Sequence, residues 1–157
     1  MISWLISNLV AGVYLGYCLQ QWGVTRSISI TFKKWEYPHK FLYTVFMIGW
    51  AVSLSLAANH WLLYIGAGMI IITGIFADTA RSDLTAKIHS YSAVGGMIIG
   101  MVAMGLFYNL WWLVIPVGLF IGWLYYANVK NKTYWAEVAV MAVVNYGVLL
   151  KDVCEIC

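Results

Sequence analysis

Residues 90–108 read SYSAVGGMIIGMVAMGLFY, and none of these nineteen positions carries a charged side chain. At a rise of 1.5 Å per residue, a helix of this length spans about 28 Å, close to the thickness of the hydrocarbon core of a bilayer. The apolar residues are continuous and do not alternate with polar ones, which excludes a strand of a membrane barrel. The stretch therefore predicts a membrane-spanning helix, and Ser82 is a suitable N-cap for the helix that leads into it.

Five more runs of the same kind lie at residues 2–19, 41–58, 61–77, 110–127 and 134–150. The first run lacks the basic start and the small-residue cleavage site of a signal peptide, so we expect it to be retained. The six runs and their short connectors use up nearly the whole length of the chain. The prediction is a single transmembrane domain over residues 1–157, an all-α integral membrane bundle of six transmembrane helices.

The composition agrees with this class. Of the 157 residues, 63% are hydrophobic and 10% are charged, whereas soluble domains contain about 25% charged residues. A soluble fold of this composition would expose large apolar patches, which excludes it. The net charge of +3 belongs to the connectors and predicts no nucleic-acid partner. Three cysteines, Cys18, Cys154 and Cys157, are too few for a disulfide framework, and the redox-like spacing of the last two is interpreted as incidental.

The basic residues predict the orientation in the membrane. Lys151 lies near the C-terminus, and the other eight Lys and Arg residues fall in the first, third and fifth connectors: Arg26, Lys33, Lys34, Lys40, Arg81, Lys87, Lys130 and Lys132. Because positive loops stay inside, these connectors are predicted to be cytoplasmic and both termini to lie on the non-cytoplasmic side. The expected location is a bacterial inner membrane.

Small residues at four-residue spacing indicate where helices pack, because helices in lipid associate by close approach of their backbones. Three pairs have this spacing, and contact within one chain is favoured over dimerisation, although a homo-oligomer stays open. The pairs are Gly12 and Gly16, Gly96 and Gly100, and Gly118 and Gly122.

Polar side chains at the edge of the membrane are the candidate site, because polar groups at membrane depth are costly and indicate function. Arg26 precedes three alternating hydroxyls, those of Ser27, Ser29 and Thr31. They are predicted either to bind a lipid head group or another anion, or, as the favoured interpretation, to cap the next helix and satisfy loop backbone.

Asp78 and His89 flank the third connector, and helical spacing directs both into the bundle. An Asp78–His89 hydrogen bond is expected there, either as a proton-handling or head-group-binding pair or as a structural closure of the hairpin. Glu137 lies one turn inside the last helix, where it either extends to the interface or joins Arg26 or His89 in a cluster. All these residues belong to the predicted cytoplasmic face.

Metal chemistry and cofactors are not predicted. A zinc site needs about three converging ligands. The histidines are His39, His60 and His89, and His60 belongs to the opposite face.

Four short segments resemble a family of small multi-span proteins of gut bacteria and their phages, distantly similar to the DRAM-like (FRAG-type) membrane proteins. The segments are Ser27-Ile28-Ser29-Ile30-Thr31-Phe32, the stretch from Gly66-Ala67-Gly68 to Ala77-Asp78, Ile88-His89-Ser90-Tyr91-Ser92-Ala93, and Tyr134-Trp135-Ala136-Glu137. The resemblance implies a six-span fold and no agreed activity.

The leading functional hypothesis is a non-enzymatic membrane protein with a cytoplasmic-side polar pocket that binds a lipid head group or handles a proton. Membrane lipid is its expected partner. One alternative is a lipid-modifying enzyme in which Asp78 and His89 act as an acid–base pair. The other is a phage-associated protein that permeabilises a membrane through an oligomeric path lined by the polar cluster.

Overall fold

The computed structural model describes residues 2–34, 41–58, 60–77 and 82–154 of the chain. Within these ranges the structure is helical and contains no strand, so the predicted all-α class is confirmed for this part of the protein. Its helices are α1 (Ile2–Trp22), α2 (Ile30–Lys34), α3 (Phe41–Ala58), α4 (Trp61–Ile75), α5 (Asp83–Tyr108), α6 (Trp111–Tyr126) and α7 (Lys132–Cys154).

Four of these helices, α1, α3, α5 and α7, are long and apolar enough to cross a membrane. The other two long helices are apolar but shorter, with 15 residues in α4 and 16 in α6. The fold is therefore a helical bundle with four helices suited to a membrane.

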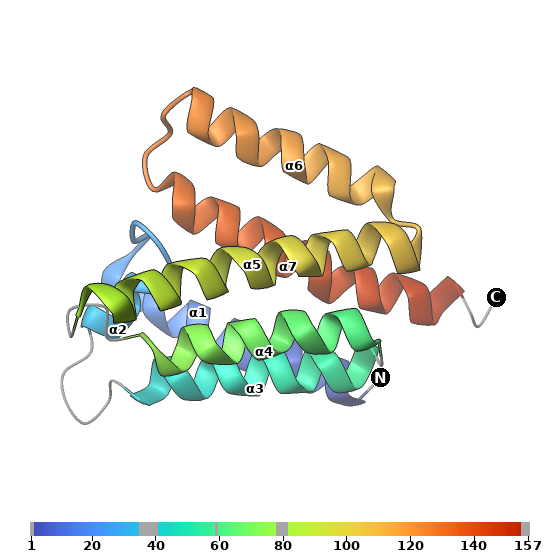
Figure 1. Cartoon of the computed structure of the whole chain (residues 1–157), viewed down its shortest axis with the longest axis horizontal. Coiled ribbons are helices and arrows are strands. Elements are labelled where there is room, and N and C mark those ends of the chain that lie inside the picture. The colour runs from blue at the N-terminus through green and yellow to red at the C-terminus, as the bar shows by residue number, and fades with distance from the viewer. Residues whose placement is uncertain (1, 35–40, 59, 78–81, 155–157) are drawn as a thin grey trace.

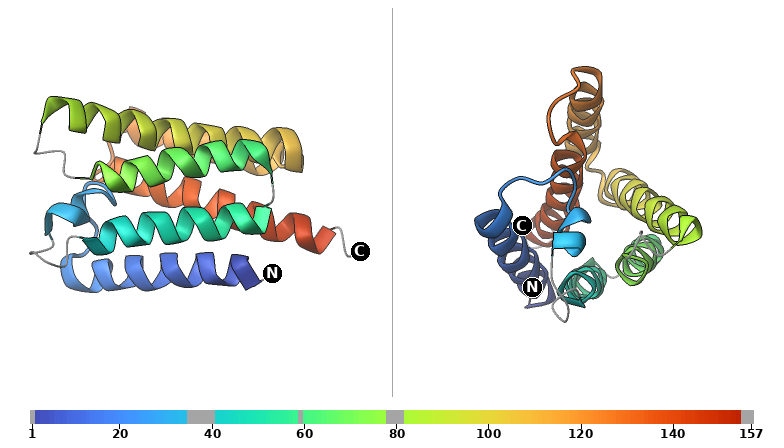
Figure 2. Two further views of the ribbon diagram at one scale, coloured as in Figure 1. Left: turned by 60° about the horizontal axis from the view of Figure 1, so that its bottom comes forward. Right: turned by 90° about the vertical axis from the view of Figure 1, so that its left-hand side faces the viewer.

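Five helices form a ring. In order around it, α1 packs against α3, α3 against α4, α4 against α5 and α5 against α7, and α7 returns to contact α1. Outside the ring, α6 packs against α5 and α7 (Figure 2). The long helices alternate in direction, so both chain ends lie at one end of the bundle and α2 lies at the other (Figure 1).

The start of α5 follows the expected capping. Ser82 has extended backbone angles, with φ −165° and ψ 161°, and its Oγ accepts a hydrogen bond from the Thr85 backbone N–H at 3.1 Å. This satisfies one of the free donors of the first helical turn. The predicted N-cap at Ser82 is confirmed, and the helix begins at Asp83, seven residues before the apolar run.

One of the three glycine pairs lies in contacts between helices. A Cβ added at Gly96 would stand 2.8 Å from Ile70 Cδ1 and 3.0 Å from the Gly66 carbonyl oxygen of α4, and one added at Gly100 would stand 3.1 Å from Val144 Cγ2 of α7. These glycines therefore let α5 approach both neighbours. At the other two pairs no heavy atom of the described chain lies within 4 Å of the Cβ position, so the structure does not bring them into packing contacts: Gly12, Gly16, Gly118 and Gly122.

Aromatic packing seats α2 on the ring. Tyr14 of α1 stacks on Phe46 of α3 with ring centroids 4.2 Å apart and planes 4° apart. Phe32 of α2 meets Tyr43 of α3 edge to face at 6.1 Å. All four side chains are buried, and such pairs add stabilisation beyond the burial of their area. The five-residue α2 is thus held by side chains of α1 and α3.

Candidate functional site at the α2 end of the ring

The segment of residues 23–34, which we call the closing segment, leaves α1 and crosses the end of the helical ring (Figure 2). Gly23 begins the turn with φ 65°, a backbone conformation that glycine adopts without steric cost. The start of α7 then holds the segment through two hydrogen bonds: Asn131 Nδ2 donates to the Val24 carbonyl at 3.1 Å, and the Tyr134 backbone N–H donates to the Arg26 carbonyl at 3.0 Å.

The three hydroxyls predicted as a polar lip make contacts within the protein. Ser27 and Ser29 share a hydrogen bond of 2.9 Å between their Oγ atoms. Thr31 is fully buried and donates to the Ile28 carbonyl at 2.6 Å, so the Tyr14 hydroxyl, also at 2.6 Å, must be the donor to Thr31 Oγ1. The structure therefore brings these hydroxyls together mainly in local bonds, and Ser29 also lines a cavity.

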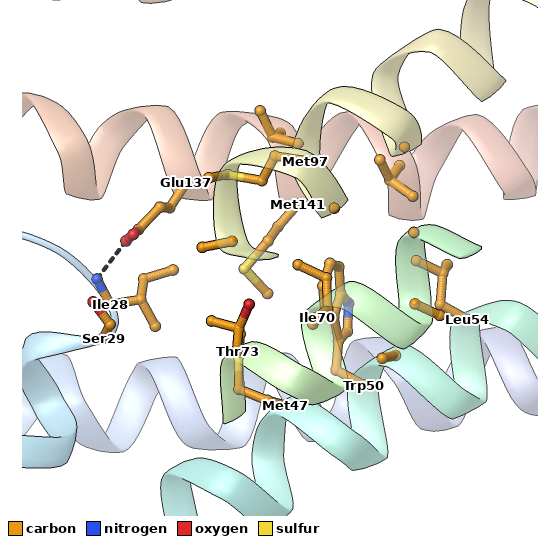
Figure 3. Close-up of a pocket in the computed structure, with 18 of the residues that line it drawn as sticks. Ile28, Ser29, Met47, Trp50, Leu54, Ile70, Thr73, Met97, Glu137 and Met141 are labelled. Carbon is orange, nitrogen blue, oxygen red and sulfur yellow. Dashed lines mark hydrogen bonds between the residues drawn. The ribbon is translucent and has the colours of Figure 1, made fainter. Parts of the chain in front are cut away.

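Glu137 extends from α7 to the closing segment. Its Oε2 accepts a hydrogen bond from the Ile28 backbone N–H at 2.5 Å (Figure 3). Within the described residues no salt bridge to this carboxylate is found, and neither Arg26, whose side chain is exposed, nor His89 contacts it. Among the described residues, this acid in an apolar helix is thus paired with a backbone amide and not with a cation.

His89 joins α5 to α4 by a buried polar contact. Its Nδ1 lies 2.9 Å from the Thr73 carbonyl oxygen, and because a carbonyl only accepts, Nδ1 carries the proton. The hydroxyls of Thr73 and Ser92, 2.9 Å apart, extend the contact. His89 faces the interior as the spacing predicted. Asp78, its expected partner, lies outside the described residues, so the Asp78–His89 bond and the enzyme hypothesis that depends on it stay predictions.

A cavity in the centre of the ring connects these groups. Its volume is about 70 Å³, and most of its lining is apolar, supplied by α3, α4, α5 and α7. Figure 3 shows Glu137 and Ser29 at the end nearest the closing segment, followed by a group of methionines and then by Trp50, Ile70 and Leu54. The polar side chains that line it are those of Ser29, Tyr43, Trp50, Ser55, Thr73, His89 and Glu137.

A second polar cluster, which the sequence analysis did not identify, lies around Asn145 of α7. Its Oδ1 accepts hydrogen bonds from Ser7 Oγ at 3.0 Å and from Trp50 Nε1 at 3.3 Å, and its backbone carbonyl accepts one from Trp4 Nε1 at 2.7 Å. Asn145 is buried, with 5% of its surface exposed. The signal in the sequence was one amide among the apolar residues that follow Glu137 in the last span, because polar side chains join helices in membranes. The cluster ties α1 and α3 to α7.

The described residues contain no cluster of three or more His, Cys, Asp or Glu that could hold a metal ion. No family model, curated protein or solved structure matches the chain. The resemblance to DRAM-like proteins therefore stays a prediction.

Proposed function

We propose that the chain is an integral membrane protein of a bacterial inner membrane that crosses it six times and binds and releases a proton at Glu137, at the cytoplasmic end of its central cavity. The protein acts in this proposal without covalent chemistry. Its closing segment is the barrier between the cavity and the cytoplasm.

The chain path supports six crossings. If α3 and α5 both cross, α4 must return the chain between them, because the connectors on either side of it are only a few residues long. The same holds for α6 between α5 and α7. Helices of 15 and 16 residues are about 22 to 24 Å long, and a bilayer adapts to such a mismatch at modest cost.

The charges support the orientation. Arg26, Lys87, Lys130 and Lys132 belong to elements at the α2 end of the bundle, and both chain ends belong to the opposite end (Figure 1). Positive loops face the cytoplasm. The orientation that follows has the closing segment inside and both termini outside.

The single observation that carries the proton hypothesis is the environment of the Glu137 carboxyl group. It lines an interior cavity, and its hydrogen-bond donor is a backbone amide instead of a fixed cation. Acidic side chains inside membrane proteins typically belong to ion or proton pathways. A cation that neutralised Glu137 permanently would prevent this role, and the described residues supply none.

The size of the cavity favours a proton over a lipid head group. At about 10–15 Å³ of this measure for each water molecule, 70 Å³ accommodates roughly five waters. Water molecules need polar partners, and Glu137, Ser29, Thr73 and His89 are among the few polar side chains in a lining that is otherwise apolar. The cavity therefore suits a proton held at Glu137 and is too small for a phosphorylated head group.

Infrared difference spectroscopy on the reconstituted protein tests this proposal. A pH titration should produce the carbonyl stretching bands of protonated carboxyl groups, and Glu137→Gln should remove the component that belongs to Glu137 while its amide oxygen still accepts from Ile28. Asp83→Asn is the matched control, because Asp83 is an exposed acid in the first turn of α5; its loss should leave the Glu137 component unchanged. Identical carboxyl bands in the native and the folded Glu137→Gln protein throughout the titration would refute proton binding at Glu137.

A further inference from the structure

A groove on the outside of the ring lies between α5, α6 and α7. Its volume is about 380 Å³, within the range of about 300–1,000 Å³ that is typical of ligand pockets. The floor comes from α5 and α7, where Met97, Met101 and Val140 lie, and α6 forms the far wall with Val114, Gly118 and Ile121. The surface of this groove is almost entirely hydrocarbon.

The groove is open along the edge of α5. Ile98 and Val94, which line it, have 58% and 52% of their surfaces exposed on the outside of the bundle. Along α6 it extends from Trp111 to Tyr125, fourteen residues or about 21 Å along the helix. One leaflet of the hydrocarbon core is about 15 Å deep. The groove is thus long enough for an acyl chain that enters from one leaflet.

One end of the groove is cationic. Lys132 Nζ lies 5.2 Å from the centre of the Tyr125 ring and donates to Asn128 Oδ1 at 2.8 Å, so its charge is held at the groove mouth. Lys130 is exposed in the same turn between α6 and α7. Glu137, one turn farther along α7, directs its carboxylate to Ile28 inside the ring. The two lysines are therefore not neutralised by this acid.

We propose that this groove binds an anionic phospholipid, with one acyl chain between α5, α6 and α7 and the phosphate group at Lys130 and Lys132. The combination of a hydrocarbon groove and two cations at one end matches the two halves of such a lipid. A second copy of the chain would supply the hydrocarbon but gives no reason for the lysines at the mouth. The groove shares Met97 and Val140 with the lining of the central cavity but opens on the outside of the ring, and the proposal does not depend on the role of Glu137.

Native mass spectrometry of the purified protein, with added phosphatidylglycerol or phosphatidylethanolamine, tests the proposal. We expect phosphatidylglycerol to be retained preferentially. Replacement of Lys130 and Lys132 by Gln should weaken this preference about fivefold for each lysine removed. Gly118→Trp should reduce the binding of both lipids, because its side chain would fill the groove at the middle of α6.

Gly122→Trp is the matched control. Gly122 lies one helical turn from Gly118 with open space around it, but it does not line the groove. Equal lipid binding by the two tryptophan variants, or equal retention of the two lipids by the native protein, would overturn the proposal. So would a dimer that Gly118→Trp dissociates, because it would identify a second copy as the occupant. If Gly118→Trp fails to fold, the Lys130 and Lys132 variants decide alone.

Discussion

Replacing Gly96 by alanine should weaken the contact between α4 and α5. The added Cβ would lie 2.8 Å from Ile70 Cδ1, 2.9 Å from Ile70 Cγ1 and 3.0 Å from the Gly66 carbonyl oxygen, whereas non-bonded carbon atoms prefer about 3.5–4.0 Å. Ile70 is buried and the Gly66 oxygen is backbone, so neither can simply turn away. The two helices have to separate by several tenths of an ångström.

The magnitude follows from a matched comparison. Overpacking of a tight interior site costs about 1–3 kcal/mol, and replacing a helical glycine by alanine gains about 1 kcal/mol of helix propensity. Gly12→Ala on α1 receives the same gain without the clash, because no described atom lies within 4 Å of its Cβ position. The Gly96 variant should therefore be about 1–3 kcal/mol less stable than the Gly12 variant.

Unfolding of both variants in mixed micelles by increasing detergent denaturant, followed by tryptophan fluorescence, measures this difference. Gly16→Ala repeats the control at a second open position. If the Gly96 and Gly12 variants have the same free energy of unfolding, α4 and α5 do not pack as closely at Gly96 as described. The comparison also separates glycines that serve packing within the chain from those that do not.

Two further predictions concern the Asn145 cluster and the orientation of the chain. Asn145→Leu removes the side-chain acceptor of Ser7 and Trp50. At about 0.6 kcal/mol for each hydrogen bond in a membrane, the free energy of unfolding in the same assay should fall by about 1–2 kcal/mol. Ser7→Ala should lower it by about half as much, and an Asn145→Leu protein of unchanged stability would contradict the cluster. Alkaline phosphatase fused to the C-terminus should be active in a bacterial host, because the enzyme needs the oxidising periplasm. The same enzyme inserted in the turn at residues 127–131 should be inactive. The reverse result would contradict the proposed orientation.

The helices themselves were predictable because their signal is local. An uninterrupted apolar run of about 18 residues specifies a helix wherever it occurs, and Ser82 marks a helix start because its hydroxyl serves the next turn of its own chain. The side-by-side order of the helices depends on packing between distant residues. The pairs at Gly12 and at Gly96 have the same spacing, and only the latter meets another helix.

Of the residues predicted for the polar pocket, Ser29, His89 and Glu137 line the central cavity, whereas Arg26, Ser27 and Thr31 do not. The donor to Glu137 is the backbone amide of Ile28, however, and a backbone donor leaves no trace in the side-chain pattern. Asn145 was not predicted because its amide is neutral, and the prediction rested on ionisable and hydroxyl side chains.

The closing segment can complete its contacts only after the last helix has been synthesised. It is made early, directly after α1, but three of its anchors, Asn131, Tyr134 and Glu137, belong to the last helix and the turn before it. The first helix also lacks hydrogen-bond partners until α7 is made, because Trp4 and Ser7 donate to Asn145 of that helix. A chain in which α7 has not yet packed therefore lacks these contacts, and its ring is open between α5 and α1.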